Sequence, residues 1–329
     1  MARIEKRGAR WRARARKNGS DVSATFDRKA DAQAWAAKVE ADATSGKLGR
    51  AVDRTFAELI DRYIEDVLPG RRGERPERLR LEKLRRDDEL ARVKLPDLGS
   101  DHIASWRDRR LKQVSAASVL REWATLSAAC TVAVKEWRWL PANPFSSVKK
   151  PPEPAPRTRR ITDAELELVL HCCGYREDGD IDTAQARVGA ALLFALETAM
   201  RAGEICGLTV DRIDRDRRVA HLPMTKNGSA RDVPLSSRAL AILARLKPEE
   251  GEPLFGLSPS TLDALWRKAR ARAGIVDLHF HDSRATALTR LAQRFNVLEL
   301  AKISGHRDLS ILSNTYYRED VANLAARLD

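Results

Sequence analysis

The sequence predicts a multidomain, mainly α-helical protein with small β-sheets in its first and last parts. Apolar residues recur at helical spacing through most of the chain, and short polar residues stand where these patterns begin. Short strand patterns occur near the N-terminus and around residues 216–235. Six prolines between Pro141 and Pro156 divide the chain. With 329 residues, 43% of them hydrophobic, the chain is long enough for two or three domains with real cores.

Residues 1–50 are predicted to form a small basic module, a β-hairpin packed on a helix. From Arg10 to Arg16 an arginine occupies every second position, which places these side chains on one face of a strand. Asn18-Gly19 is a strong hairpin signal, and a second strand follows over Val22–Phe26. A helical pattern then covers residues 31–39. The arginine face either lies in a DNA groove or is a solvated charged face, and these residues alone do not decide between the two.

Residues 53–150 are predicted to form a helical domain. Thr55-x-x-Glu58 is a capping box, and an apolar helical stripe follows it as far as Leu68. Further helical patterns cover residues 79–84, 103–111 and 119–139, with no convincing strand between 55 and 145. The aromatic and leucine stripe is predicted to be core, so the arginines of this domain are the better candidates for DNA contacts.

The proline-rich segment that follows is predicted to be a semi-rigid, extended linker, because proline fixes φ and lacks a backbone donor. Its positive charge predicts that it lies along a phosphate backbone. The basic residues concerned are Lys149, Lys150, Arg157, Arg159 and Arg160. Folding resumes at a second capping box, Thr162-x-x-Glu165.

Residues 157–329 are predicted to form a mixed but mainly α domain with a small antiparallel sheet. A buried helix is expected from Val188 to about Ala199. Short strands are expected over Arg218–Leu222 and Arg231–Leu235, with a turn at Lys226-Asn-Gly between them. Helices then begin at Ser258-Pro259, His281 and Asn296, and Gly305 ends the last of these.

The charge predicts a polyanionic partner. Sixty Lys and Arg residues against 47 Asp and Glu give a net charge of +13. Nucleic acid is favoured over a membrane, because no apolar run approaches the ~20 residues that a spanning helix needs. The basic N-terminus also lacks the apolar segment of a secretory signal.

No metal and no cofactor are predicted. The chain has no C-x-x-C pair and no glycine-rich phosphate loop that ends in Lys-Ser/Thr. The four cysteines are expected to be reduced, mostly buried thiols; they are Cys130, Cys172, Cys173 and Cys206.

Several polar residues of the third domain become candidates for catalysis only as a set. Each alone has an ordinary explanation: a lysine in an Asn-Gly turn is normally solvated, and a histidine after a glycine is a normal helix end. The set is Arg201, Lys226, His281, Arg284, His306, Tyr316 and Tyr317.

The order and neighbours of these residues resemble the signature of the tyrosine recombinase (phage integrase) family. The segments are Thr198-Ala-Met-Arg201-Ala-Gly-Glu204-Ile, His281-Asp-Ser-Arg284, Ser304-Gly-His306 and Thr315-Tyr316-Tyr317-Arg318. The resemblance covers the whole chain. Residues 1–50 resemble the arm-type DNA-binding module of lambda-type integrases, residues 53–150 their core-binding domain and residues 157–329 their catalytic domain.

The resemblance implies a site-specific DNA recombinase, an integrase that integrates or excises a mobile element through a 3′-phosphotyrosyl intermediate. It implies double-stranded DNA with core and arm sites, a homotetramer on that DNA, host DNA-bending proteins, an excision factor, and a cytoplasmic place at the nucleoid of a bacterial cell. One alternative is a type IB topoisomerase or telomere resolvase, against which the arm module argues. The other is a non-catalytic architectural protein on a recombinase-derived fold, which would lack at least one charged catalytic position.

The residue types suit phosphoryl transfer without a metal. Fixed positive charge must meet the charge that develops on the phosphate. Arg201 and Arg284 can supply it through forked hydrogen bonds. The resemblance gives the leaving-group proton to Lys226. His281 could accept or relay the tyrosine proton, His306 would hydrogen-bond the phosphate, and Glu204 would orient a group of the site.

Two positions depart from the family pattern. Ala199 stands where the family often has glycine, a small change that should be tolerated. In many members the tyrosine lies nine residues after the Gly-His histidine, where this chain has Thr315. A one-residue insertion favours Tyr316, whereas Tyr317-Arg-Glu-Asp resembles the lambda-type run. Tyr316 is therefore the first choice of nucleophile and Tyr317 the second.

Overall fold

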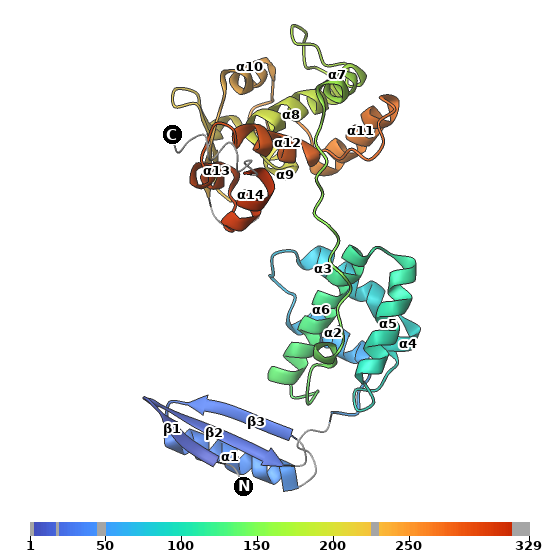
Figure 1. The fold of residues 1–329 in the computed structure, drawn as a ribbon, viewed down its shortest axis with the longest axis vertical. Helices are drawn as coiled ribbons and strands as arrows, with labels where there is room; N and C mark the ends of the chain where they lie inside the picture. Colours follow the sequence, from blue (N-terminus) through green and yellow to red (C-terminus); the bar gives the residue numbers. More distant parts are fainter. Residues whose placement is uncertain (1–2, 18–19, 45–50, 225–229, 318–329) are drawn as a thin grey trace, which may run out of the picture. The chain divides into compact units, whose positions relative to one another are not determined.

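The computed structural model describes residues 3–17, 20–44, 51–224 and 230–317 (Figure 1). The chain divides into two compact units, Met1–Pro156 and Arg157–Asp329. Within the described residues the fold is mainly helical with two small antiparallel sheets, which confirms the predicted fold class. Among these residues, no helix is both long enough and apolar enough to cross a membrane.

The N-terminal module is a three-stranded antiparallel sheet with one helix against it (Figure 1). Its elements are β1 (Arg3–Arg7), β2 (Arg10–Lys17), β3 (Ser20–Phe26) and α1 (Lys29–Thr44). Ala13 of β2 is buried with Ala32 and Ala36 of α1. Since side chains alternate along a strand, Arg12 and Arg14 lie on the opposite face of the sheet. Strand β1 adds to the predicted hairpin, whose Asn18-Gly19 turn lies outside the described residues.

The remainder of the first unit is helical, as predicted. Its helices are α2 (Phe56–Asp66), α3 (Glu74–Leu84), α4 (Asp88–Ala91), α5 (Ser100–Gln113), α6 (Ala116–Lys135) and the 3₁₀ turn η1 (Pro144–Ser147). The predicted capping box begins α2, because the Glu58 amide donates to Thr55 Oγ1 at 3.2 Å. Trp106, Trp123 and Phe145 pack ring against ring in the centre, with centroids 4.9 to 6.3 Å apart. The aromatic stripe is therefore core.

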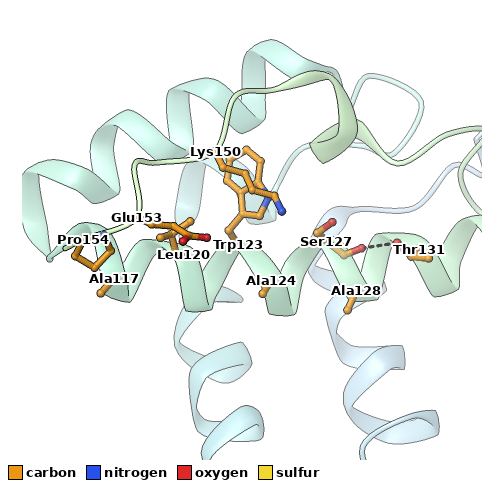
Figure 2. Close-up of a pocket in the computed structure, with 10 residues that line it drawn as sticks. All are labelled: Ala117, Leu120, Trp123, Ala124, Ser127, Ala128, Thr131, Lys150, Glu153 and Pro154. Carbon is orange, nitrogen blue, oxygen red and sulfur yellow. Dashed lines mark hydrogen bonds between the residues drawn. The ribbon is translucent and has the colours of Figure 1, made fainter. Parts of the chain in front are cut away.

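The proline-rich segment begins against the helical part. Pro151 is buried, and Arg107 of α5 donates to the Lys149 carbonyl at 2.7 Å. Figure 2 shows Lys150, Glu153 and Pro154 beside α6, where they line an open hollow of about 650 Å³. No helix or strand is formed over residues 149–162, as expected for an extended linker.

The arginines at the end of this segment contact protein groups in the free protein. Arg157 donates to the carboxylates of Asp277 and Asp282 at 2.8 to 3.0 Å. Arg160 donates to Thr289 at 2.8 Å, and Arg159 is paired with Glu165. These three guanidinium groups hold the segment to the protein, while Lys149, Lys150 and Arg157 are exposed.

The second unit is built around α8, which is buried along most of its length. Helices α7, α9, α10, α11 and α12 all pack against it (Figure 1). The elements are α7 (Asp163–Cys172), α8 (Ala184–Thr198), α9 (Ala202–Cys206), η2 (Val210–Arg212), β4 (Ile213–Asp214), β5 (Val219–Leu222), β6 (Arg231–Pro234), α10 (Ser237–Arg245), α11 (Pro259–Arg272), α12 (Asp282–Leu291), α13 (Val297–Ser304) and α14 (Leu309–Tyr316). Strands β4, β5 and β6 form the predicted antiparallel sheet in that order.

The predicted helix ends of this unit are confirmed. Capping boxes begin α7 at Thr162 and α13 at Asn296, and Ser258 with Pro259 begins α11. Gly305 ends α13 with φ of 72°, the left-handed conformation that glycine adopts without steric strain. The four cysteines are free thiols, and only Cys172 is partly exposed.

Candidate active site

Arg201 lies where α8 gives way to α9. Helix α8 ends in Ala199, which is buried and adopts the left-handed conformation at φ 53° and ψ 21°. The chain turns there, and Arg201 is the N-cap residue of α9. Glu204 accepts from the Arg201 amide at 2.8 Å and from Arg201 Nη1 at 3.0 Å. The turn and this carboxylate together fix the direction of a side chain that is 20% exposed.

Glu204 is shared with a second arginine that the sequence reasoning missed. Arg231 of β6 donates from both terminal nitrogens to the two Glu204 oxygens, at 2.8 and 2.7 Å. Its Nε donates to the Ile303 carbonyl at 3.0 Å. Burial opposes the charge of Glu204, but the bonds from Arg231 and Arg201 outweigh it and lower the pKa of this carboxyl to about 2. Glu204 is therefore ionised at neutral pH.

Arg284 is buried, at 3% exposure. It lies in the first turn of α12 and donates to the carbonyls of Ala199 and, at 2.6 Å, Ser304. Burial lowers the pKa of Arg284 to about 9, and the charges of Arg201 and Arg231 act in the same direction. Arg284 stays protonated at neutral pH, and two carbonyls from distant segments hold it in place.

His306 follows the left-handed turn at Gly305. Its Nδ1 lies 2.6 Å from Ser304 Oγ, and that hydroxyl donates to the Leu300 carbonyl at 2.6 Å. Burial lowers the pKa of His306 to about 4, and the charges of Arg284, Arg201 and Arg231 add to the effect. In the free protein His306 is thus a neutral imidazole beside three guanidinium groups.

The two adjacent tyrosines have different surroundings. Tyr316 is half-buried, and the guanidinium carbon of Arg160 lies 5.4 Å from its ring centroid. Burial raises the pKa of Tyr316, while the charges of Arg160 and Arg284 oppose the rise. The hydroxyl of Tyr317 instead donates to the Phe295 carbonyl at 2.5 Å. Burial raises the pKa of Tyr317, and the Glu299 carboxylate raises it further.

The two remaining predicted residues are His281 and Lys226. His281 is exposed and immediately precedes α12. Asp282, the first residue of that helix, accepts a hydrogen bond from Arg157. Lys226 lies outside the described residues. Strand β6, which follows the predicted Lys226 turn in the sequence, carries Arg231.

The described site is a concentration of fixed positive charge. Arg201, Arg231 and Arg284 surround one carboxylate, Glu204, which leaves a net charge of +2 at neutral pH. Such a cluster suits an anion, and forked guanidinium groups match the oxygens of a phosphate. In the described part of the chain, no three His, Cys, Asp or Glu side chains are grouped as metal ligands.

The chain is similar to known proteins over nearly its full length. Residues 159–323 match the model of the phage integrase family. A putative integrase/recombinase of Haemophilus influenzae is 45% identical over 333 residues, which cover 98% of this chain and 88% of the relative.

Two solved structures show the same fold. The Tn1549 transposon integrase (residues 82–397), in complex with circular intermediate DNA, has a TM-score of 0.67 at 20% identity, covering 84% of this chain and 99% of that chain. A lambda integrase dimer bound to a COC′ core site has a TM-score of 0.66 at 17% identity, covering 97% of this chain and 95% of that chain.

Proposed function

Because this chain belongs to the phage integrase family and is a tyrosine-type site-specific recombinase, we propose that it integrates or excises a mobile element through a covalent 3′-phosphotyrosyl intermediate. The observation that carries the proposal is the placement of Arg201 and Arg284. These two residues are 83 positions apart in the sequence, yet both lie beside Glu204, His306 and the turn at Ala199.

In the proposed reaction the scissile phosphate binds between the two arginines. Their N–H groups neutralise the charge that gathers on the non-bridging oxygens as the phosphorus becomes five-coordinate. The tyrosine oxygen attacks phosphorus, the bond to the 5′ oxygen breaks, and the 3′ phosphate stays on the enzyme. The energy of the broken bond is kept in the phosphotyrosine, so rejoining is the same step in reverse.

Two proton transfers complete the step. The tyrosine hydroxyl loses its proton as it attacks, and His281 is the proposed acceptor. The leaving 5′ oxygen gains a proton, for which Lys226 is the proposed donor. His306 is neutral in the free protein, because its pKa is near 4. A bound phosphate brings negative charge beside it and raises that pKa, so that a protonated His306 can donate to the phosphate.

Tyr316 is the proposed nucleophile, and its surroundings support the choice that spacing left open. Burial raises the pKa of Tyr316, but the charges of Arg160 and Arg284 oppose that rise and favour the phenolate that attacks. The neighbouring charge at Tyr317 is the Glu299 carboxylate, which disfavours a phenolate. The Tyr317 hydroxyl is also occupied by the Phe295 carbonyl.

The proposed partner is double-stranded DNA, held by three domains, residues 1–50, 53–150 and 157–329. The net charge of +13 and the exposed arginine face of the N-terminal sheet support it. A homotetramer on a four-way junction is proposed by analogy with the lambda integrase tetramer solved on a Holliday junction. Host DNA-bending proteins and an excision factor are the proposed accessory partners.

The first test is covalent capture. A duplex carrying its recombination site and a nick close to the cleavage point loses the short product, so the protein stays attached to the 3′ phosphate. We expect the wild-type protein to form this adduct, seen as a shifted band on a denaturing gel, at an undiminished rate in excess chelator, because the arginines supply the charge. DNA binding without an adduct would favour the architectural alternative. Strict dependence on a divalent metal would contradict the proposed chemistry.

The second test concerns the N-terminal module. Removal of residues 1–50 is expected to leave adduct formation on a core-site duplex within a few-fold of wild type, while integration of a full attachment site is lost. The reason is that the catalytic cluster is complete without this module, whereas a second DNA site needs its own binding surface. A gel assay of both reactions with the same two proteins measures this. Equal integration by the truncated protein would exclude an arm-binding role.

A further inference from the structure

We infer that Arg231 is a positioning residue for strand cleavage: by occupying both oxygens of Glu204, it leaves the guanidinium of Arg201 available to the DNA phosphate. The inference rests on the proposed function, because it concerns how the same cluster is kept ready for its substrate. Arg231 is distinct from the predicted catalytic residues. It does not have to touch DNA for this role.

The hydrogen bonds around Glu204 are divided unequally. Arg231 meets the carboxylate as a fork, with one terminal nitrogen on each oxygen at 2.8 and 2.7 Å. The Arg201 guanidinium makes one bond to this carboxylate, from Nη1 at 3.0 Å, and its backbone amide makes another. A guanidinium carries five N–H donors, and that side-chain bond uses one of them. Arg201 is thus oriented by Glu204 without being saturated by it.

Loss of Arg231 would change this division. Glu204 is 9% exposed, so its ionised form needs donors from the protein. The guanidinium already at 3.0 Å belongs to Arg201, and a forked pair with Glu204 is the geometry that it would adopt. Arg201 would then be turned toward the carboxylate, and the net charge of the cluster would fall from +2 to +1. Both changes weaken the hold on a phosphate.

Arg231 also reaches the turn that presents His306. Its Nε donates to the Ile303 carbonyl at 3.0 Å. A Cβ atom added at Gly305 would lie 3.1 Å from both Cδ and Nη1 of Arg231, so the glycine allows this close approach. One buried side chain therefore joins β6, the start of α9 and the end of α13. Arg201 stands at the start of α9, His306 follows the end of α13, and β6 follows the predicted Lys226 turn in the sequence.

The experiment compares single-turnover adduct formation on the nicked duplex at saturating DNA. We expect Arg231→Gln to slow adduct formation about 100-fold, the size of effect seen when one transition-state donor is lost. DNA affinity should stay within about threefold, because many other contacts bind the backbone. The rate of Arg231→Lys should lie between those of the wild type and Arg231→Gln, since lysine keeps the charge but loses the forked hydrogen bonds. The double variant Arg231→Gln with Glu204→Gln should recover at least about tenfold over Arg231→Gln, since no carboxylate then competes for Arg201.

Arg245 provides the matched control. It is a part-buried guanidinium of the same unit, and it donates to the Tyr175 hydroxyl at 2.7 Å and to the carbonyls of Arg176 and Gly179 at 2.5 Å. Arg245→Gln should lower Tm and leave the cleavage rate of the folded protein unchanged. A merely structural role of Arg231 would give the same result as this control.

The cleavage rates of these variants decide whether Arg231 is a positioning residue. An Arg231→Gln protein that cleaves at the wild-type rate overturns the inference, and so does a double variant no faster than Arg231→Gln. If Arg231→Gln does not fold, Arg231→Lys decides: a slower rate supports the inference and an unchanged rate overturns it. Absence of an adduct with the wild-type protein would instead overturn the proposed function itself, which separates the two failures.

Discussion

Tyr316→Phe is expected to abolish the covalent protein–DNA adduct, a loss on the order of 10⁴-fold or more, as when other enzymes lose their nucleophile. The substitution removes one oxygen atom and keeps the ring. The ring contact with Arg160 at 5.4 Å and the packing against the cluster around Leu312 are therefore retained. Folding and DNA binding should stay close to wild type. The nicked duplex and a denaturing gel measure the adduct, and thermal unfolding checks the fold.

Tyr317→Phe is the matched control for this result. It removes the hydrogen bond from the Tyr317 hydroxyl to the Phe295 carbonyl, which costs about 1 kcal/mol of stability. Adduct formation should remain within a few-fold of wild type. An adduct that survives Tyr316→Phe and disappears with Tyr317→Phe would assign the nucleophile to Tyr317. The insertion between His306 and the tyrosine would then be two residues rather than one.

Arg284→Lys is expected to have the next largest effect, a 10²- to 10³-fold slower cleavage rate by order of magnitude. Lysine keeps the positive charge but is a single ammonium group. It cannot meet the carbonyls of Ala199 and Ser304 together and still present a fork to the phosphate. The free energy of unfolding should also fall by about 1 to 3 kcal/mol, because a buried carbonyl is left without its donor.

The two effects of Arg284→Lys can be measured separately. Single-turnover cleavage at saturating DNA gives the rate, and urea unfolding gives the stability. Arg245→Lys is the control, since it removes a guanidinium that holds only protein groups in the same unit. It should lower stability without slowing cleavage. An Arg284→Lys protein that cleaves as fast as wild type would show that the charge alone suffices, and would contradict the forked contact.

Local signals in the sequence predicted the elements well. The capping residues Thr55, Thr162, Ser258 and Asn296 each mark a helix start, because the cap and its partner amide lie within three residues of each other. Strand β1 was missed, because its residues Arg3–Arg7 are mostly polar and their pairing partner is the neighbouring strand β2. The first turn of α3 was missed because it contains Pro76, which is tolerated where no helical amide bond is needed.

The sequence predicted the site only in part, because some of its residues pair with partners far away in the chain. No neighbouring residue in the sequence indicates a role for Arg231, since its partners Glu204 and Ile303 lie 27 and 72 positions away in the chain. The ion pair of Arg157 with Asp282 was missed for the same reason, because it joins residues 125 positions apart. Spacing also left the two tyrosines unresolved, whereas their surroundings differ in the sign of the nearest charge.

The left-handed turn at Ala199 limits which residue types fit at this position. Its carbonyl accepts from Arg284 while the residue adopts φ of 53°, and its methyl group lies in a buried apolar cluster with Ala287 and Leu288. Asparagine and aspartate accept that backbone conformation but would bring an unpaired polar group into the cluster. β-Branched and larger residues are strained by it. Alanine bears the smallest strain of any apolar residue with a Cβ, and glycine bears none, so these two residues suit this position best.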